Sequence, residues 1–218
     1  DQGKGTLNIT NGANLTTNIF RMGQYPTWAS TVTFSETNAD GAGSRMLVSG
    51  SMDLGVMTYG YGDPHVTLNI TNGGYVSVGG NLDLAQGATT TAIVNIDGGT
   101  LDLQGNSITR GAGTSEVNFI GGTLANVGSI DGGLHQKGGV LAAGGSPGTM
   151  PIAGDYLQDA GAILEVEVGD YSEAAGIGYD FYDVAGAATL NGTLDALTYA
   201  GFVQNVGDTV DILTATSI

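Results

Sequence analysis

The segment Val66–Leu84 reads VTLNITNGGYVSVGGNLDL and contains three short runs of alternating apolar and polar residues. The runs Val66–Ile70, Tyr75–Val78 and Leu82–Leu84 are separated by Asn-Gly-Gly and Gly-Gly-Asn. A period of two is typical of β-strands, in which successive side chains point to opposite faces. Asn and Gly accept the positive φ angles of tight turns. The segment therefore predicts three strands joined by sharp turns, with Asp83 on the outer, solvent-facing side.

The same phrase returns elsewhere in the chain. LNITNG at residues 7–12 recurs at 68–73, and weaker copies begin at Val94 (VNIDGGTL) and Val117 (VNFIGGTL). A second phrase, VSGSMDLG at residues 48–55, recurs as VGGNLDLA at 78–85. Strands this short cannot bury a face alone, whereas stacking copies about 4.8 Å apart completes each ladder and builds a continuous apolar column. The repeats predict an all-β chain folded as a parallel β-helix (β-solenoid).

An alternative interpretation treats each Asn-Gly pair as a hairpin turn, which gives an antiparallel sandwich. We favour stacking because the same turn recurs with the same flanking phrase, which a sandwich has no reason to repeat. No helix is expected. The best helical candidate, Tyr171–Gly178, is bounded by Gly and too short to persist unaided.

Two regions are expected. Residues 1–137 carry the β-helix coils, with inserted loops around residues 17–65, where the spacing is least regular. Residues 138–218 carry longer strands, and in the stretch 162–168 the apolar residues alternate with Ile163 and two glutamates, which predicts a half-buried strand with an acidic outer face. This second region is expected to close or cap the column.

The second region also resembles a known family. The phrases GGVLAAGGSPGTM (138–150), GDYLQDAGA (154–162), YDFYDVAG (179–186), ATLNGTL (188–194) and GDTVDILT (207–214) follow one another in order. Together they resemble the end of autotransporter-type passenger β-helices and of secreted bacterial proteins with PEP-CTERM sorting signals. The resemblance implies a right-handed parallel β-helix exported to the cell exterior or the cell surface. It implies little about chemistry.

Charge and composition narrow the function classes. The 218 residues include 5 Lys and Arg against 21 Asp and Glu, a net charge of −16, which opposes binding to nucleic acid or to an anionic membrane. No run of about 18 apolar residues survives the frequent glycines, so direct membrane insertion through a helix is not expected. The chain has no Cys, which excludes disulfides and thiolate metal sites.

Catalytic groups are sparse. The five basic residues are scattered, and His65 and His135 lie in different segments without a nucleophile phrase. Polysaccharide-cleaving β-helix enzymes need paired carboxylates with basic helpers, or calcium with a basic residue. We therefore expect a protein that is not an enzyme and needs no cofactor, calcium being the one ion considered.

Calcium is considered because Asp is the abundant charged residue and calcium takes oxygen ligands. Asp53, Asp83 and Asp102 share an apolar-Asp-Leu context, and stacking is expected to bring them near one another on one outer face. Their unequal spacing leaves a second interpretation open, in which they are solvated residues that keep the surface soluble.

Aromatic residues in the expected loops suggest a second ligand class. Trp28, Tyr25, Tyr59 and Tyr61 present flat apolar faces of the kind that cover sugar rings. Extracellular glycans are therefore a candidate partner. The alternative is that these rings pack against the flank of the column.

The leading hypothesis is structural. An uncapped column exposes unpaired strand edges, and such edges recruit other chains. The terminal strands near Leu7–Ile9 and Val210–Leu213 are the expected contacts, with Leu7, Ile9, Val210 and Ile212 as the apolar side chains. This predicts an extracellular structural or adhesive protein that associates with itself, end to end, into a filament, matrix or surface layer. The alternative is a polysaccharide-binding or polysaccharide-cleaving β-helix protein.

Overall fold

Every strand pair that forms the two sheets of the molecule is parallel. The computed structural model describes residues 5–24, 29–36, 43–56, 63–145, 147–171 and 174–218. Within them, 22 strands form one 14-stranded sheet and one 8-stranded sheet, and no residue is helical. The antiparallel sandwich is therefore wrong, and the all-β prediction with parallel pairing is confirmed.

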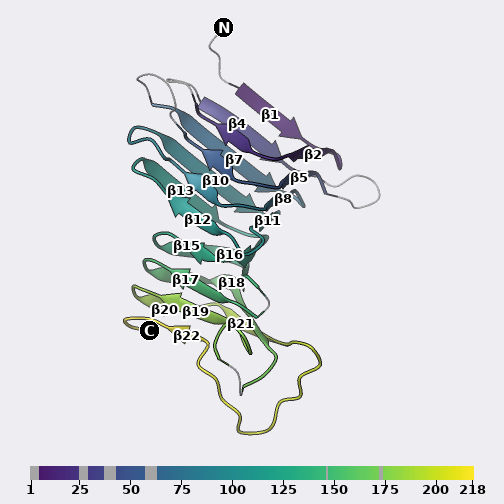
Figure 1. Cartoon of the computed structure of the whole chain (residues 1–218), viewed down its shortest axis with the longest axis vertical. Helices are drawn as coiled ribbons and strands as arrows, with labels where there is room; N and C mark the ends of the chain where they lie inside the picture. The colour runs from purple at the N-terminus through teal and green to yellow at the C-terminus, as the bar shows by residue number, and fades with distance from the viewer. Residues whose placement is uncertain (1–4, 25–28, 37–42, 57–62, 146, 172–173) are drawn as a thin grey trace.

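The strands fall into three rows, each made of strands that pair with the equivalent strand of the next layer (Figure 1). Row 1 contains β1 Gly5–Ile9, β4 Ala29–Phe34, β7 His65–Thr71, β10 Thr91–Asp97, β13 Thr114–Phe119 and β20 Ala188–Leu190. Row 2 contains β2 Asn14–Thr17, β5 Arg45–Val48, β8 Tyr75–Val78, β11 Thr100–Asp102, β14 Thr123–Val127 and β21 Thr193–Thr198. Two long strands, β16 Leu134–Ala143 and β18 Tyr156–Val168, run through both rows and join them into the larger sheet.

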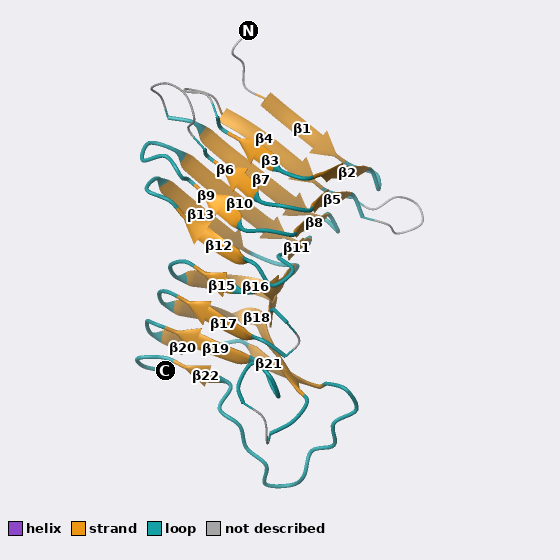
Figure 2. Ribbon diagram, in the orientation of Figure 1, coloured by secondary structure: helices purple, strands orange, loops and turns teal. Residues whose placement is uncertain are grey.

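Row 3 is the smaller sheet. It contains β3 Phe20–Met22, β6 Met52–Leu54, β9 Leu82–Leu84, β12 Ser107–Arg110, β15 Ser129–Ile130, β17 Thr149–Ile152, β19 Phe181–Val184 and β22 Leu213–Thr214. The described chain thus passes through eight layers, from β1–β3 at one end to β20–β22 at the other. Figure 2 shows the strands piled along the long axis of the molecule, with loops around the edges.

One core runs through all the layers. The inward residues of the three rows form a single buried cluster that reaches from Met22 to Val184. In the third layer Val66, Leu68 and Ile70 are buried while Thr67 and Asn69 are half-buried, as the alternation predicts. The observed strands β7, β8 and β9 match the three predicted runs to within one residue.

The predicted turns adopt the expected backbone. Asn72 and Gly73 have φ values of 47° and 83°, and Asn11 and Gly12 in the first copy of the phrase have 57° and 74°. In this protein the Asn-Gly pair does not reverse the chain into a hairpin. It turns the chain from row 1 to row 2, so the next strand pairs with the layer above and the layer below.

The region 17–65 supplies four strands, β3 to β6, whose phrases occupy the same row positions as those of other layers. The segments 25–28, 37–42 and 57–62 lie outside the described residues, so the inserted loops expected in this region stay a prediction. One expectation about organisation needs correction. The stretch expected to close or cap the column instead continues it, since β18 carries β20 and β21, and β19 carries β22. The longer strands predicted after residue 138 are confirmed, and residues 137 and 138 both lie inside β16.

The long strands pass the corner between rows 1 and 2 with the help of two buried glutamines. Gln136 donates from Nε2 to the carbonyl oxygens of Gly139, at 2.8 Å, and Ile163, at 3.0 Å, and accepts from Tyr156 Oη at 2.6 Å. Gln158, in register with Gln136 one layer on, bonds the backbone of Gly192 and Thr193. Their amides satisfy backbone groups that the bend leaves without a ladder partner.

Candidate assembly surfaces at the two ends

The first layer exposes apolar side chains whose equivalents in the inner layers are covered by the next layer. Leu7 is 41% exposed, whereas its row neighbour Val32 is 3% exposed. Ile9 and Leu15 are half-buried against the core. Strands β1, β2 and β3 each pair with one neighbour only, so the outer edge of each has unpaired backbone groups within the described residues. Leu7 and Ile9, the contacts predicted at this end, therefore lie on an edge strand of the described stack.

The last layer is exposed in the same way. All six residues of β21 are exposed, and Leu190 and Leu194 are 41% and 53% exposed although they continue inward-facing columns. Strands β21 and β22 have one paired neighbour each among the described strands. The outer edge at the start of β20 is instead met by the C-terminal residues, because Ala187 forms a parallel bridge with Ser217 and the Ala188 N–H donates to the Ser217 carbonyl oxygen at 2.8 Å. An exposed parallel edge with an apolar inner face is a template for another strand.

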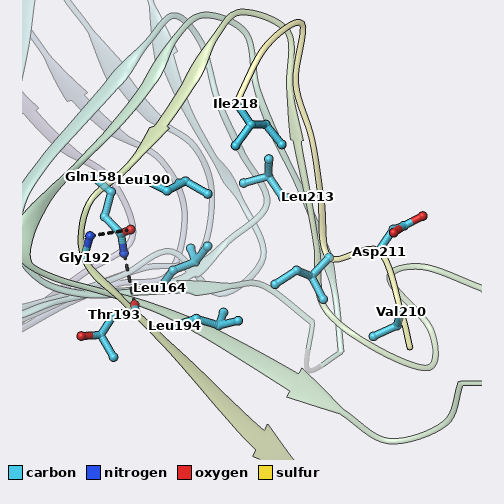
Figure 3. A pocket seen from close by; sticks show the side chains of 11 residues that line it. Gln158, Leu164, Leu190, Gly192, Thr193, Leu194, Val210, Asp211, Leu213 and Ile218 are labelled. Carbon is cyan, nitrogen blue, oxygen red and sulfur yellow. Dashed lines mark hydrogen bonds between the residues drawn. The ribbon is translucent and has the colours of Figure 1, made fainter. Parts of the chain in front are cut away.

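A cavity of about 340 Å³ opens at this end (Figure 3). Apolar side chains from β18, β20, β21 and the segment before β22 surround it, and the Gln158 amide lies at its side. Its lining residues are Gln158, Leu164, Leu190, Gly192, Thr193, Leu194, Val210, Asp211, Ile212, Leu213 and Ile218. The cavity is therefore the apolar interior of the column where the last layer leaves it open.

The predicted contacts Val210 and Ile212 both line this cavity, but they do not lie in a strand. Only Leu213–Thr214 forms a strand there, and residues 199–212 form a long loop between β21 and β22 (Figure 1). The alternation in VDILT (210–214) predicts a strand. In the structure only Leu213 and Thr214 of this phrase are paired with β19, opposite Tyr182 and Asp183. The exposed apolar residues at this end that sequence analysis did not name are Leu190 and Leu194.

The three aspartates considered for calcium do not gather. Asp53 and Asp83 are neighbours in row 3, but Asp102 belongs to β11 in row 2 of the other sheet. Their shared context places each on an outer surface, but not on the same one. Among the described residues, no group of three or more His, Cys, Asp or Glu side chains is arranged to hold a metal ion.

Asp53 and Asp83 instead belong to a polar ladder on row 3. Arg21 Nε donates to Asp53 Oδ2 at 2.5 Å, and Thr109 Oγ1 donates to Asp83 Oδ1 at 2.5 Å. The ladder contains one residue from each of four successive layers, in the order Arg21, Asp53, Asp83 and Thr109. Burial raises the pKa of Asp83, and the adjacent Asp53 carboxyl group raises it further.

Asp102 has a different set of partners on row 2. It accepts hydrogen bonds from Tyr75 Oη at 2.6 Å, from Asn126 Nδ2 at 3.0 Å and from the Gln104 backbone N–H at 3.0 Å. The Arg45 guanidinium lies 4.7 Å from the centre of the Tyr75 ring. These contacts link side chains from four successive layers, so the cluster stabilises the stack.

A second surface feature is an amide ladder on the outside of row 1. Asn95 donates from Nδ2 to Asn69 Oδ1 at 2.7 Å, Asn118 donates to Asn95 Oδ1 at 2.9 Å, and Asn69 donates to Thr33 Oγ1 at 3.2 Å. The repeated Asn of the sequence phrase is half-buried on the outward side of each strand. Stacking makes these side chains partners across layers, 26 and 23 residues apart in sequence.

The remaining candidates are placed as follows. Tyr25, Trp28, Tyr59 and Tyr61 lie outside the described residues. His135 Nε2 lies 2.9 Å from Asp159 Oδ2 on the exposed side of β16 and β18, and His65 is in β7. Arg110 donates to the backbone oxygens of Asp131 and Ser115, and its burial lowers its pKa.

No protein family model, no curated protein and no solved structure matches this chain. The part of the chain that the structure describes contains no helix with the length and apolar character needed to cross a membrane.

Proposed function

We propose that the chain is a right-handed parallel β-helix that serves as a structural or adhesive protein outside the cell and assembles end to end. The single observation that carries this proposal is the matched exposure of apolar edge residues, Leu7 in the first layer and Leu190 and Leu194 in the last. Apolar side chains at the two edges stay in contact with water, so the edges lack the favourable apolar burial that stabilises every inner layer. A second copy supplies that burial without any new kind of contact.

The contact joins two different surfaces of the molecule, the first layer of one copy and the last layer of another. Such a head-to-tail contact does not close on itself when the copies are related by a shift along an axis, so it propagates. The product is a filament, matrix or surface layer. Extracellular or cell-surface location follows from the resemblance of residues 138–214 to exported β-helices.

Composition supports a role without catalysis. The net charge of −16 keeps single copies and filaments soluble and repels polyanionic substrates. The described arginines Arg21, Arg45 and Arg110 are engaged with side chains or backbone of the stack itself. Their positions favour strengthening of the column over binding of an acidic substrate.

The test compares charged substitutions at the edges with one on the flank. Leu7→Lys and Leu194→Lys place a cation on the two end surfaces, whereas Leu47, which is 40% exposed on the outside of β5, provides the matched control Leu47→Lys. We expect filaments of the unaltered chain and of the Leu47 variant in negative-stain micrographs, and concentration-dependent growth in sedimentation. The two edge variants should remain monomeric at the same concentrations.

Monodisperse monomers of the unaltered chain at high concentration would overturn the proposal. So would filaments that tolerate both edge substitutions. A glycan array and a reducing-sugar assay separate the rival class, since a polysaccharide-binding or polysaccharide-cleaving protein gives a signal in one of them as a monomer.

A further inference from the structure

The connection from row 2 to row 3 is short in the first six layers and long in the last two. The short connections are residues 18–19, 49–51, 79–81, 103–106, 128 and 144–148. The long ones are residues 169–180 and 199–212, and the second forms a wide loop beyond the strands (Figure 1). In repeat folds such insertions gather on one side of the stack and commonly carry a function. The two long connections therefore mark a place where the chain departs from its own repeat.

The described residues of the first long connection are held by local hydrogen bonds. The Gly178 carbonyl oxygen accepts from the backbone N–H groups of Gly169 at 2.7 Å and Asp170 at 2.8 Å. The Ala174 carbonyl oxygen accepts from the Ile177 N–H at 3.0 Å. Although the Ile177 side chain is 64% exposed, the backbone around it cannot be extended without breaking these bonds.

The second long connection, residues 199–212, is bonded differently. A turn at its tip joins Asn205 to Asp208, since the Asp208 N–H donates to the Asn205 carbonyl oxygen at 3.2 Å and the Asn205 N–H donates to Asp208 Oδ2 at 2.9 Å. In the described part of the chain, no hydrogen bond joins residues 203–211 to any strand. Val203 is 79% exposed and Val206 is fully exposed. The tip can therefore change conformation without the loss of a ladder bond.

We infer that the tip of this loop is a processing site for an endoprotease that selects small apolar side chains, and that the cut chain stays assembled. An endoprotease binds its substrate as an extended strand, whose backbone bonds to the enzyme. Exposed loop tips without other backbone partners reach this form at the least cost. In the cleavage, water adds to the carbonyl carbon of Val203 or Val206, the peptide C–N bond breaks, and the nitrogen of the next residue takes the proton. This inference does not depend on end-to-end assembly.

The residues of the loop decide the class of protease. Lys137 is the last basic residue of the sequence, so a trypsin-like enzyme has no site in the loop. Phe202 is the one aromatic residue between positions 200 and 212, and its ring packs edge-on against Tyr171 with 4.9 Å between ring centres. The apolar side chains left free at the tip are therefore Val203 and Val206. Pockets that accept small apolar side chains are those of elastase-like enzymes.

The residues that follow the loop are fixed to the stack. The Tyr182 N–H donates to the Ile212 carbonyl oxygen at 2.9 Å, and Leu213 and Thr214 pair with β19. The Ser217 carbonyl oxygen accepts from the start of β20 at 2.8 Å. Ile212 and Leu213 also pack against the core. These contacts are expected to hold the two pieces together after the cut.

The test is limited proteolysis of the folded chain with pancreatic elastase. Mass spectrometry of the denatured digest locates the cuts, and size-exclusion chromatography in native buffer shows whether the pieces stay together. We expect a cut after Val203 or Val206, no cut between Ala174 and Gly178, and elution of the two pieces as one species. Unfolding in urea should then separate them.

The test variant combines Val203→Asp with Val206→Asp. The matched control is Ile177→Asp, because it replaces an exposed apolar residue of the other long connection. The loop of the double variant should be cut at least about tenfold more slowly than that of the parent, and the loop of the control at the parent rate.

Each part of the inference has its own contrary result. A loop that stays intact in the folded chain, while elastase cuts it in the urea-unfolded chain, would overturn the processing site. Equal loop cleavage of the double variant and the parent would overturn selection by the two valines. Separation of the pieces in native buffer would overturn the retained assembly. Valine-dependent cleavage of the loop with pieces that elute together would support the inference.

Discussion

Asp53 and Asp83 lie side by side in register on the outside of row 3, so two carboxyl groups share one step of the ladder. Their other neighbours differ, since Arg21 pairs with Asp53 and Thr109 with Asp83. Asp53 is 7% exposed and forms an ion pair with the guanidinium group of Arg21, whereas Asp83 accepts a hydrogen bond from a neutral hydroxyl group. The ionised form of Asp83 is therefore the less favourable of the two, and the pKa of Asp83 is raised by burial and by the Asp53 carboxyl group.

Asp83→Asn is predicted to stabilise the protein at pH 8. The amide oxygen keeps the bond from Thr109, and the like-charge pair disappears, which is worth about 0.2–1 kcal/mol for directly opposed cross-strand residues. Asp53→Asn is predicted to destabilise it, because Arg21 loses its partner. Urea denaturation at a series of pH values from 8 downward checks this, and the gain from Asp83→Asn should shrink as the pH falls through the raised pKa of Asp83. Equal effects of the two substitutions would contradict the assignment.

Asp180 is predicted to control the pH dependence of stability. It is 2% exposed, and its carboxyl oxygens accept from the backbone N–H groups of Gly148 and Glu167 at 2.7 Å and 2.8 Å. Burial raises the pKa of Asp180 to about 6 in spite of those bonds, and nearby glutamates add to the rise. A carboxyl group with a higher pKa in the folded state binds more protons there, so stability increases as pH falls from 8 through 6 and decreases as pH rises.

The measurement is the unfolding midpoint between pH 4.5 and pH 8. Asp180→Asn should flatten the slope near pH 6, whereas Asp97→Asn, at an exposed position of β10, should leave the slope unchanged. Asp180→Ala should lower stability by about 2–4 kcal/mol, because two buried N–H groups lose their acceptor. A wild-type curve that rises with pH through 6 would refute the assignment.

The amide ladder on row 1 should stabilise the fold in proportion to the number of its hydrogen bonds. Asn95→Ala breaks the bonds to both Asn69 and Asn118 and is predicted to cost about 1–2 kcal/mol, whereas Asn118→Ala breaks one bond and should cost about half as much. Chemical denaturation of the two variants beside the parent gives the comparison. If the terminal substitution costs as much as the central one, the ladder does not stabilise the fold in the way described.

Crowding, beyond positive φ, makes some glycines indispensable. Gly122 and Gly105 have nearly equal φ values of 79° and 83°, but a Cβ on Gly122 would lie 2.1 Å from the carbonyl oxygen of Gly99, whereas a Cβ on Gly105 would have no atom within 4 Å. Gly105→Ala should cost about 1–2 kcal/mol from backbone strain alone. Gly122→Ala should cost at least about 2 kcal/mol more, because adjacent layers must separate. Thermal melting of both variants tests this, and similar losses would argue against crowding.

The sequence could predict the strands of the third layer because each carries its own alternation and its own Asn-Gly or Gly-Gly-Asn turn. Parallel pairing was also predictable, since copies of one phrase can share a register only when they run in the same direction. The prediction of the region 17–65 was less complete because its phrases are separated by longer segments, so the regular strands β4 and β5 were hidden by uneven spacing.

The amino-acid sequence by itself determined the all-β class, the inward and outward faces of each strand, and the acidic, cysteine-free surface. Local rules govern these features, since alternation and turn chemistry act within a few residues. Only the tertiary structure decided which outward residues become neighbours. It placed Asp102 on a different sheet from Asp53 and Asp83, joined Asn69 to Asn95, and left Leu194 at an open end, because the number of residues between layers varies and pairing across that gap is decided by the whole stack.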